Sequence, residues 1–201
     1  MRNVVYVSGV HGCGKSTLRK MLEKDHRFLL HTRPGHCHFD EPYYRQAWRL
    51  TRYHIEALDQ QQWSEANPRR IILGDRCVYD GQLYTRAFAD LGWMSQERAD
   101  QLEQFFQVLF PLALRPEYVV HLSMPKEWVK DLIRRRWEIE GQKWREDQFA
   151  YFDQVYDKYE AFYASPPCQV LRLTTTNRAD QVTQIMAWLE NIPHFAPSLM
   201  R

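Results

Sequence analysis

The sequence predicts an open, doubly wound α/β fold: a five-stranded parallel sheet with helices on both faces. Two observations lead to this prediction. Five short apolar runs alternate with longer segments of helical periodicity along the chain, which is typical of buried parallel strands and their crossover helices. A glycine-rich loop also follows the first apolar run directly, at the position where such folds bind phosphate groups.

Each apolar run has the length of a buried strand, and each intervening segment can form a crossover helix. The predicted strands are Val4–Ser8, Phe28–Thr32, Arg70–Asp75, Tyr118–Ser123 and Cys168–Thr174. The predicted helices are Lys15–Lys24, Tyr43–Ala66, Asp80–Leu91, Ser95–Leu114, Pro125–Glu138, Trp144–Ala164 and Ala179–Glu190. Right-handed crossovers place these helices on both faces of the sheet. Ligands are then expected beyond the carboxyl ends of the strands.

Composition and charge exclude several classes of protein. The chain has 201 residues, of which 44% are hydrophobic and 26% charged, as in a globular domain and not a disordered or fibrous chain. We therefore expect residues 1–201 to form a single domain. A net charge of +2 is too small to favour binding to long nucleic acid or to a membrane surface. No apolar run approaches the roughly 20 residues of a membrane span, and we expect a cytoplasmic location.

The segment Gly9–Ser16 matches the pattern G-x-x-x-x-G-K-[ST] in full, between a predicted strand and a predicted helix. Glycines permit the tight backbone that aims N–H groups at phosphate oxygens, and the helix N-terminus adds its dipole. The sequence therefore predicts a P-loop that binds ATP. Lys15 is expected to bridge the β- and γ-phosphates, and Ser16 to hold Mg²⁺. The predicted ATP-binding residues of the loop are Gly9, Gly12, Cys13, Gly14, Lys15, Ser16 and Thr17.

An acid and an arginine, Asp75 and Arg76, follow the third predicted strand. At the carboxyl end of a strand beside the P-loop, Asp75 can reach Mg²⁺ and Arg76 can stabilise a phosphoryl group during its transfer. A salt bridge at a strand end is the structural alternative. The D-x-x-G and N-K-x-D patterns of GTPases and the L-S-G-G-Q signature of transporters are absent from their expected places, which excludes those classes.

Three consecutive arginines, Arg134, Arg135 and Arg136, lie near the end of a predicted helix. Guanidinium groups match the geometry of phosphate oxygens. The segment 134–145 is therefore predicted to form an arginine-rich lid that closes over ATP. A solvated helix face is the structural alternative.

Two adjacent carboxylates, Asp40 and Glu41, precede the long predicted helix Tyr43–Ala66. Either could accept the proton of an attacking hydroxyl group. Either could instead serve as a negative charge at the helix N-terminus, where the helix dipole favours it. Because Pro42 biases Glu41 toward an extended backbone, its side-chain direction is better defined than that of Asp40.

Together these features resemble the deoxyribonucleoside kinases and, more distantly, the thymidylate kinases, over most of the chain. The matching stretches are Gly9–Thr17, Glu41-Pro42 with Trp48 six residues after the proline, Asp75–Tyr79, His121–Pro125, Arg134–Glu140 and the stretch from Tyr151 to Phe162. The resemblance implies an enzyme that transfers a phosphoryl group from MgATP to the 5′-hydroxyl of a nucleoside, in particular a deoxynucleoside. It further implies that Glu41 activates that hydroxyl, that Arg76 assists at the transferring phosphate and that the lid arginines surround ATP.

The acceptor side departs from the family pattern. The stretch after Trp48 is shortened and begins Arg49-Leu50-Thr51-Arg52, in a region where the family carries a glutamine that pairs with the base. Arg52 is similar to the arginine with which thymidylate kinases bind the nucleotide's own phosphate. An aspartate at the position of Asp75 is commoner in thymidylate kinases than in nucleoside kinases, which have a glutamate. A nucleoside monophosphate kinase is therefore the alternative, and a P-loop ATPase or nucleotide sensor is a further one. The remaining predicted acceptor-site residues are aromatic side chains that could stack on a base: Trp48, Tyr53 and Tyr84.

Two further features carry no predicted chemistry. The cluster His31, His36, Cys37 and His38 fits no zinc-ligand spacing, and the four cysteines form no C-x-x-C pair, so reduced thiols are expected. The predicted helix Ser95–Leu114 has an apolar face wide enough for the core or for a homodimer.

Overall fold

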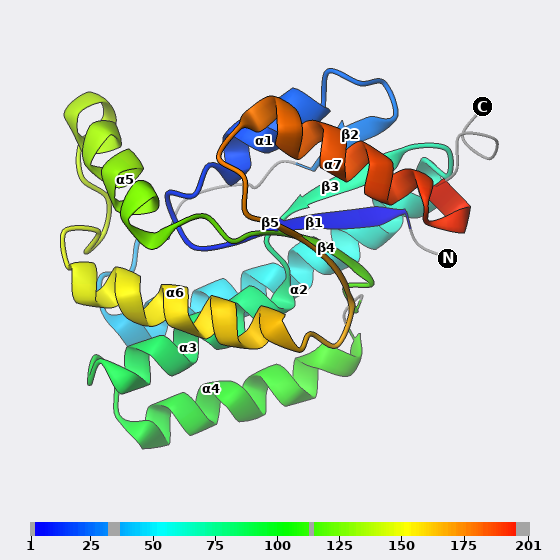
Figure 1. The fold of residues 1–201 in the computed structure, drawn as a ribbon. Helices are drawn as coiled ribbons and strands as arrows, with labels where there is room; N and C mark the ends of the chain where they lie inside the picture. Colours follow the sequence, from blue (N-terminus) through cyan, green and yellow to red (C-terminus); the bar gives the residue numbers. More distant parts are fainter. Residues whose placement is uncertain (1–2, 32–36, 113–114, 196–201) are drawn as a thin grey trace.

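The computed structural model describes residues 3–31, 37–112 and 115–195. Five strands form one sheet in the order β2-β3-β1-β4-β5, and every adjacent pair is parallel (Figure 1). This confirms the predicted fold class. The strands are β1 (Val4–Ser8), β2 (Phe28–Leu30), β3 (Ile71–Asp75), β4 (Tyr118–Leu122) and β5 (Gln169–Leu173).

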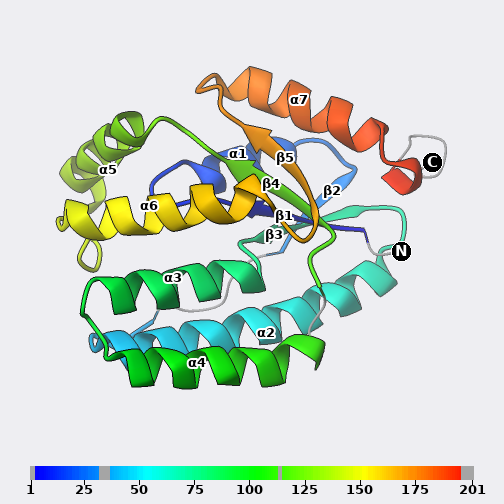
Figure 2. The same cartoon turned by 60° about the horizontal axis from the view of Figure 1, so that its bottom comes forward.

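The helices cover both faces of the sheet. Helices α1 and α7 lie on one face, and α2, α3 and α6 lie on the other, with α4 packed on α2 and α3 as an outer layer (Figures 1 and 2). Helix α5 projects beyond the carboxyl ends of the strands. The α-helices of the described residues are α1 (Lys15–Leu22), α2 (Pro42–Ala66), α3 (Val78–Asp90), α4 (Gln96–Leu109), α5 (Lys126–Glu140), α6 (Phe149–Ala164) and α7 (Arg178–Glu190).

The central strands form the core and align the residues that follow them. All residues of β1 and β4 are buried, because helices exclude water from both faces of the sheet. The register pairs Val7 with Asp75 and Ser8 with His121, so the chain leaves β1, β3 and β4 at the same edge. The P-loop and Asp75-Arg76 are therefore neighbours. No helix among the described residues has both the length and the apolar character needed to cross a bilayer.

The region around the predicted lid differs from the sequence prediction. Helix α5 continues to Glu140, two residues beyond the predicted end at Glu138, and Gly141 follows it with φ +75°. All three predicted lid arginines are helical, as the predicted helix already implied. The predicted start of the next helix at Trp144 is wrong, because α6 begins at Phe149. Arg145 has φ +50°, which an α-helix does not permit. Residues 142–148 instead form a connector between α5 and α6.

Two other predicted ends also differ. Helix α4 ends at Leu109, and a short 3₁₀ turn that contains Pro111 follows it, since proline lacks the N–H that would continue the α-helix. Strand β2 ends at Leu30. The predicted end points Leu114 and Thr32 lie outside the described residues.

Candidate active site

The loop between β1 and α1 folds around the ammonium group of Lys15. Gly9, Gly12 and Gly14 have φ values of +139°, +81° and +91°, which favour glycine. The Nζ atom of Lys15 donates hydrogen bonds to the carbonyl oxygens of Gly9 at 2.9 Å and Val10 at 2.7 Å. Burial lowers the pKa of Lys15 to about 8. A phosphate group at this position would supply the negative charge that favours the protonated ammonium group.

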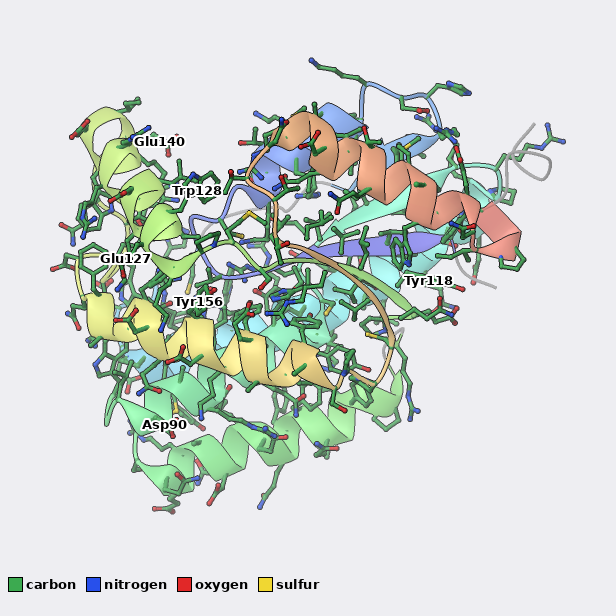
Figure 3. All side chains as sticks on the ribbon, in the orientation of Figure 1. Asp90, Tyr118, Glu127, Trp128, Glu140 and Tyr156 are labelled. Carbon is green, nitrogen blue, oxygen red and sulfur yellow. The ribbon has the colours of Figure 1, made fainter. Side chains whose placement is uncertain are left out.

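A cavity of about 760 Å³ lies beside this loop, and we call it the donor cavity. Its size is in the range of cofactor-binding sites. Helix α5 contributes Trp128 near its start and Glu140 at its far end, both labelled in Figure 3. The predicted residues that line the cavity are Gly12, Gly14, Lys15, Ser16, Thr17, Asp75, Arg76 and Arg136. Gly9 and Cys13 instead support the loop, through the Gly9 carbonyl and a 3.6 Å contact of the Cys13 Sγ atom with Lys15 Nζ.

Of the three predicted lid arginines, Arg136 lines the donor cavity. It forms an ion pair with Glu146 of the connector. Arg134 forms an ion pair with Asp131 at 2.6 Å on the exposed side of α5, and Arg135 is exposed. Successive residues of a helix point about 100° apart, so three consecutive arginines do not face one ligand together.

Arg178, at the start of α7, is a cation of the donor cavity that the sequence analysis did not identify. Its Nη2 atom donates to the carbonyl oxygen of Cys13 at 3.2 Å, and its guanidinium lies 5.7 Å from the centre of the Trp128 ring. A Cβ atom on Gly14 would lie 1.8 Å from the Arg178 Nη2 atom. The glycine therefore allows this arginine to approach the P-loop.

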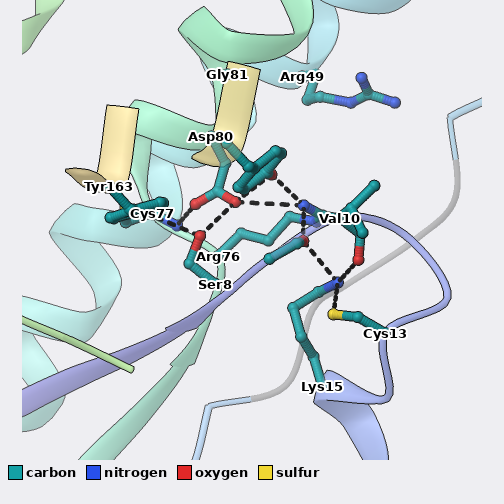
Figure 4. A network of polar contacts seen from close by, with 12 residues as sticks. Ser8, Val10, Cys13, Lys15, Arg49, Arg76, Cys77, Asp80, Gly81 and Tyr163 are labelled. Carbon is teal, nitrogen blue, oxygen red and sulfur yellow. Dashed lines mark hydrogen bonds and ion pairs between the residues drawn. The ribbon is translucent and has the colours of Figure 1, made fainter. Parts of the chain in front are cut away.

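Arg76 is held by a buried carboxylate that the sequence analysis also missed, Asp80 in the first turn of α3. The Arg76 Nη1 atom lies 3.2 Å from Asp80 Oδ1. The same carboxylate accepts hydrogen bonds from Ser8 Oγ at 2.8 Å, from the Cys77 backbone N–H at 2.8 Å and from the Tyr159 hydroxyl. Figure 4 shows this network beside Lys15. A helix that begins directly after a buried strand and carries an acid at its third position has the pattern of a capping box. That pattern could have identified Asp80 from the sequence.

A second cavity of about 220 Å³ adjoins the donor cavity, and we call it the acceptor cavity. It lies among α2, α3, α6 and the connector. Four residues line both cavities, and we call them the junction residues: His11, Arg76, Lys143 and Glu146. The residues that line the acceptor cavity but not the donor cavity are Arg45, Arg49, Tyr53, Tyr84, Trp144 and Tyr151. A group passing between the two cavities would pass Arg76.

His11 occupies a variable position of the P-loop, to which the sequence analysis assigned no chemistry. Its ring stacks on Tyr151 at a centroid distance of 5.0 Å and meets the edge of Phe152 at 5.5 Å. Burial, with the positive charges of Arg76 and Lys15, lowers its pKa well below the usual value. The imidazole is therefore neutral at pH 7, and neither ring nitrogen has a hydrogen-bond partner in the described structure.

The structure separates the predicted acceptor-site residues into two groups. Tyr53, Tyr84 and Arg76 line the acceptor cavity. Trp48 and Arg52 line neither cavity. The Arg52 Nε atom instead donates to Glu56 at 2.6 Å, and its guanidinium lies over the Trp48 ring at 4.8 Å.

Glu41 also lines neither cavity. It is the N-cap of α2, where one carboxylate oxygen accepts a hydrogen bond from the Tyr44 backbone N–H at 2.8 Å. The other oxygen forms an ion pair with Arg98 of α4 at 2.9 Å. In the structure, the side chain therefore stabilises the start of α2, as the helix-dipole alternative predicts.

Both predicted metal ligands line the donor cavity. They are the Ser16 hydroxyl and the Asp75 carboxylate, and Asp75 Oδ2 lies 3.3 Å from Arg19 Nη1. Mg²⁺ prefers oxygen ligands and is often held by one or two side chains together with phosphate oxygens and water, so these residues fit the ion. Among the described residues, no group of three or more His, Cys, Asp or Glu side chains is arranged to hold a metal.

The fold places the glycine-rich loop beside two adjoining cavities at the carboxyl edge of the sheet. A profile of the deoxynucleoside kinase family matches residues 5–191. The chain therefore belongs to the deoxynucleoside kinase family. This confirms the resemblance found in the sequence and the prediction that the protein is a nucleoside kinase. The alternative of a monophosphate kinase is not favoured by this match.

Solved structures of a deoxyadenosine kinase from M. mycoides have the same fold. The structure with bound dCTP has a TM-score of 0.74 and 18% sequence identity, and covers 93% of this chain and 98% of the other. The structure with bound dATP has a TM-score of 0.72 and 18% identity, and covers 94% and 100%. A search among curated protein sequences gives no match.

Proposed function

We propose that the protein transfers the γ-phosphoryl group of ATP, with Mg²⁺, to the 5′-hydroxyl of a deoxynucleoside. The observation that supports this most directly is the junction of the two cavities at Arg76. A fixed guanidinium between a phosphate site and an acceptor site can stabilise the charge of a phosphoryl group during transfer. Asp80 fixes it, so little reorganisation is needed at the moment of reaction.

On the donor side, Lys15 and the P-loop N–H groups would bind the β- and γ-phosphates. Arg136 and Arg178 would add positive charge, which for Arg136 requires release from Glu146. Ser16 and Asp75 would hold Mg²⁺, which neutralises charge on the phosphate oxygens. The lid in this proposal comprises the outer part of α5 and the connector, with Arg136 as its phosphate-binding arginine.

On the acceptor side, the resemblance assigns Glu41 as the acceptor of the 5′-hydroxyl proton. This role requires its carboxylate to leave Arg98 when the acceptor binds. Glu146 is the carboxylate that already lies at the junction, and we therefore compare the two. If Glu41 is the proton acceptor, Glu41→Gln lowers kcat by about 10²–10⁴, whereas Glu146→Gln and Asp40→Asn cost far less. A severe Asp40→Asn or Glu146→Gln variant beside a nearly normal Glu41→Gln variant would overturn the assignment.

The function is tested by measuring ADP formation from MgATP with a panel of deoxynucleosides and their monophosphates. We expect deoxynucleosides to stimulate ADP formation by the wild type, and we expect no such stimulation in Lys15→Met. The exposed Lys24→Met on the same side of the sheet is the matched control and keeps the activity. No stimulation by any nucleoside, or stimulation by monophosphates alone, would contradict the proposal.

We also propose the cytoplasmic location that the sequence predicts, and a homodimer, which is one of the two uses that the sequence leaves open for the apolar face of residues 95–114. Ile55 and Leu58 of α2 and Phe105 and Val108 of α4 are between 38% and 70% exposed, and these two helices pack against each other. Exposed apolar side chains that gather in one patch mark interaction surfaces, and we propose that these four form such a patch. Light scattering should give twice the monomer mass of 24.2 kDa for the wild type and the monomer mass for Val108→Glu. A wild-type protein that has the mass of the monomer would refute the dimer.

A further inference from the structure

The part of the acceptor cavity away from the junction has an unusual combination of side chains. It is lined by two arginines, Arg45 and Arg49, and by four aromatic residues. The aromatic residues are Tyr53, Tyr84, Trp144 and Tyr151. Flat aromatic walls suit a planar ring system, so this is where the base of the acceptor would lie. Neither a carboxylate nor a carboxamide side chain lines this part of the cavity.

Arg49 is positioned by contacts that leave part of its guanidinium available. Its Cζ atom lies 4.3 Å from the centre of the Tyr84 ring, and its Nη1 atom donates to Gln46 Oε1 at 3.1 Å. Gln46 is fully buried, and its Nε2 atom donates to the carbonyl oxygen of Gly81 and to Thr85 Oγ1. The Nε2 donors of Gln46 are therefore engaged within the protein, and its Oε1 atom accepts from Arg49. In Figure 4 no hydrogen bond or ion pair joins the Arg49 guanidinium to the Arg76–Asp80 network.

Arg45, one helical turn before Arg49, supplies a second guanidinium. Its Cζ atom lies 4.3 Å from the centre of the Trp144 ring, and its Nη1 atom donates to the carbonyl oxygen of Phe39 at 2.8 Å. Its Nε atom is buried and has no hydrogen-bond partner in the described structure. Burial and the charge of Arg49 lower the pKa of Arg45. Two neighbouring cations without a carboxylate on their own wall call for a ligand that brings hydrogen-bond acceptors.

The possible acceptors of hydrogen bonds lie elsewhere in the cavity or are weak. Glu146 is at the junction, where it pairs with Arg136 and accepts a hydrogen bond from Trp137 Nε1 at 3.3 Å. His11 is also at the junction. Burial raises the pKa of Tyr84 and of Tyr151, so their hydroxyls stay protonated and neutral. The charged groups that face the base are donors alone.

We propose that Arg45 and Arg49 select acceptors whose base carries a carbonyl oxygen where adenine and cytosine carry an amine. This inference rests on the proposed function and names its substrate class: deoxynucleosides of 6-oxopurines and 4-oxopyrimidines. A guanidinium fork can donate two hydrogen bonds to O6 and N7 of a 6-oxopurine. In a 4-oxopyrimidine it can donate to the O4 oxygen, whose neighbouring N3–H is itself a donor. An exocyclic amine at the same place would set N–H donors against N–H donors and leave both without partners, which is costly in a buried site.

The inference does not follow the name of the structural neighbours. Those structures are of a deoxyadenosine kinase, at 18% identity, and adenine carries the amine that Arg45 and Arg49 disfavour. Base selection is assigned here from the side chains of this chain.

The test uses two matched pairs of nucleosides that differ in the exocyclic group and in the proton on the ring nitrogen beside it: deoxyinosine against deoxyadenosine, and deoxyuridine against deoxycytidine. We expect kcat/KM to be about 10- to 100-fold higher for deoxyinosine than for deoxyadenosine, the usual worth of a good bidentate contact. We expect a smaller preference in the same direction for deoxyuridine over deoxycytidine, because O4 alone accepts. If the amine members are phosphorylated equally well or better, the inference is wrong while the proposed function stands. If none of these four nucleosides is phosphorylated, and neither deoxyguanosine nor thymidine is, the proposed function itself fails.

Variants then assign the selectivity to the guanidinium. Arg49→Gln offers a carbonyl oxygen as well as an amide N–H, so we expect the ratio within each pair to fall, by about tenfold or more in the purine pair, through loss of activity on the carbonyl member. Arg49→Lys keeps the charge but not the fork and should also reduce the ratio. Arg86 is an exposed arginine of α3, and Arg86→Gln is the matched control. This control should leave the ratio within each pair unchanged. Unchanged ratios in folded Arg49→Gln and Arg49→Lys would overturn the assignment.

Discussion

Asp80 should contribute more to stability than its position in a short helical turn suggests. Its side chain is fully buried and holds the guanidinium of Arg76, which is 8% exposed. Asp80→Asn keeps the shape but leaves Arg76 as a buried charge without its carboxylate partner. Breaking a buried ion pair in this way costs about 3–5 kcal/mol. We therefore expect the free energy of unfolding to fall by that amount.

The expected change in Tm follows from the size of the chain. With an unfolding entropy of about 2 cal/mol/K per residue, 201 residues correspond to about 0.4 kcal/mol of stability per degree near Tm. The loss in Asp80→Asn then lowers Tm by about 7–12 °C, measured by calorimetry. Asp90→Asn, in the exposed last turn of the same helix, removes a surface ion pair with Lys158 and should cost less than about 1 kcal/mol. Equal shifts for the two variants would refute the reasoning.

Three further predictions concern the donor site. Burial lowers the pKa of Lys15 to about 8 and a bound phosphate favours its charged form, so ATP binding above pH 8 should take up a proton. The affinity for ATP should therefore fall by up to about tenfold per pH unit above pH 8. Calorimetry in buffers of different ionisation enthalpy should detect the proton uptake in the wild type and not in Lys15→Met. A Cβ atom on Gly12 would lie 2.4 Å from Ile133 of α5, so Gly12→Ala should distort the P-loop and raise the Kd for ATP at least tenfold, and an unchanged Kd would contradict the described loop. Arg136→Gln should raise the KM for ATP whereas Arg135→Gln should not, because Arg136 alone of this pair lines the donor cavity; steady-state kinetics would refute this if the two variants behaved alike.

The sequence predicts the fold correctly and predicts residues that lie together beside the P-loop, because both depend on local patterns. Apolar runs identify the buried strands, and the P-loop pattern places Lys15 and Ser16 at the sheet edge. The register of β1 and β3 then brings Asp75 and Arg76 to the same edge, as expected for parallel strands. The positions of these residues are set by their neighbours in the sequence or by adjacent strands. The pattern of apolar runs already defines those strands.

The acceptor side is less predictable because it is built from long-range contacts. Arg45 and Trp144 are 99 positions apart in the sequence, yet they stack across the acceptor cavity. Nothing local distinguishes Arg49, which lines this cavity, from Arg52, which pairs with Glu56. Only the rotation of α2 about its axis decides which arginine faces inward. The predicted helix start at Trp144 fails for a related reason, since the connector wraps over the cavity instead of continuing α6.

The most direct test of the account is the identity of the product. The protein is incubated with MgATP and deoxyinosine, and the product is examined by phosphorus NMR with proton coupling. Transfer to the 5′-hydroxyl gives a phosphate coupled to the two protons of a CH₂ group, a triplet, formed in equal amount to ADP and absent with Lys15→Met. A doublet from a 3′-phosphate, or ADP that forms together with inorganic phosphate and no nucleotide product, would contradict the account.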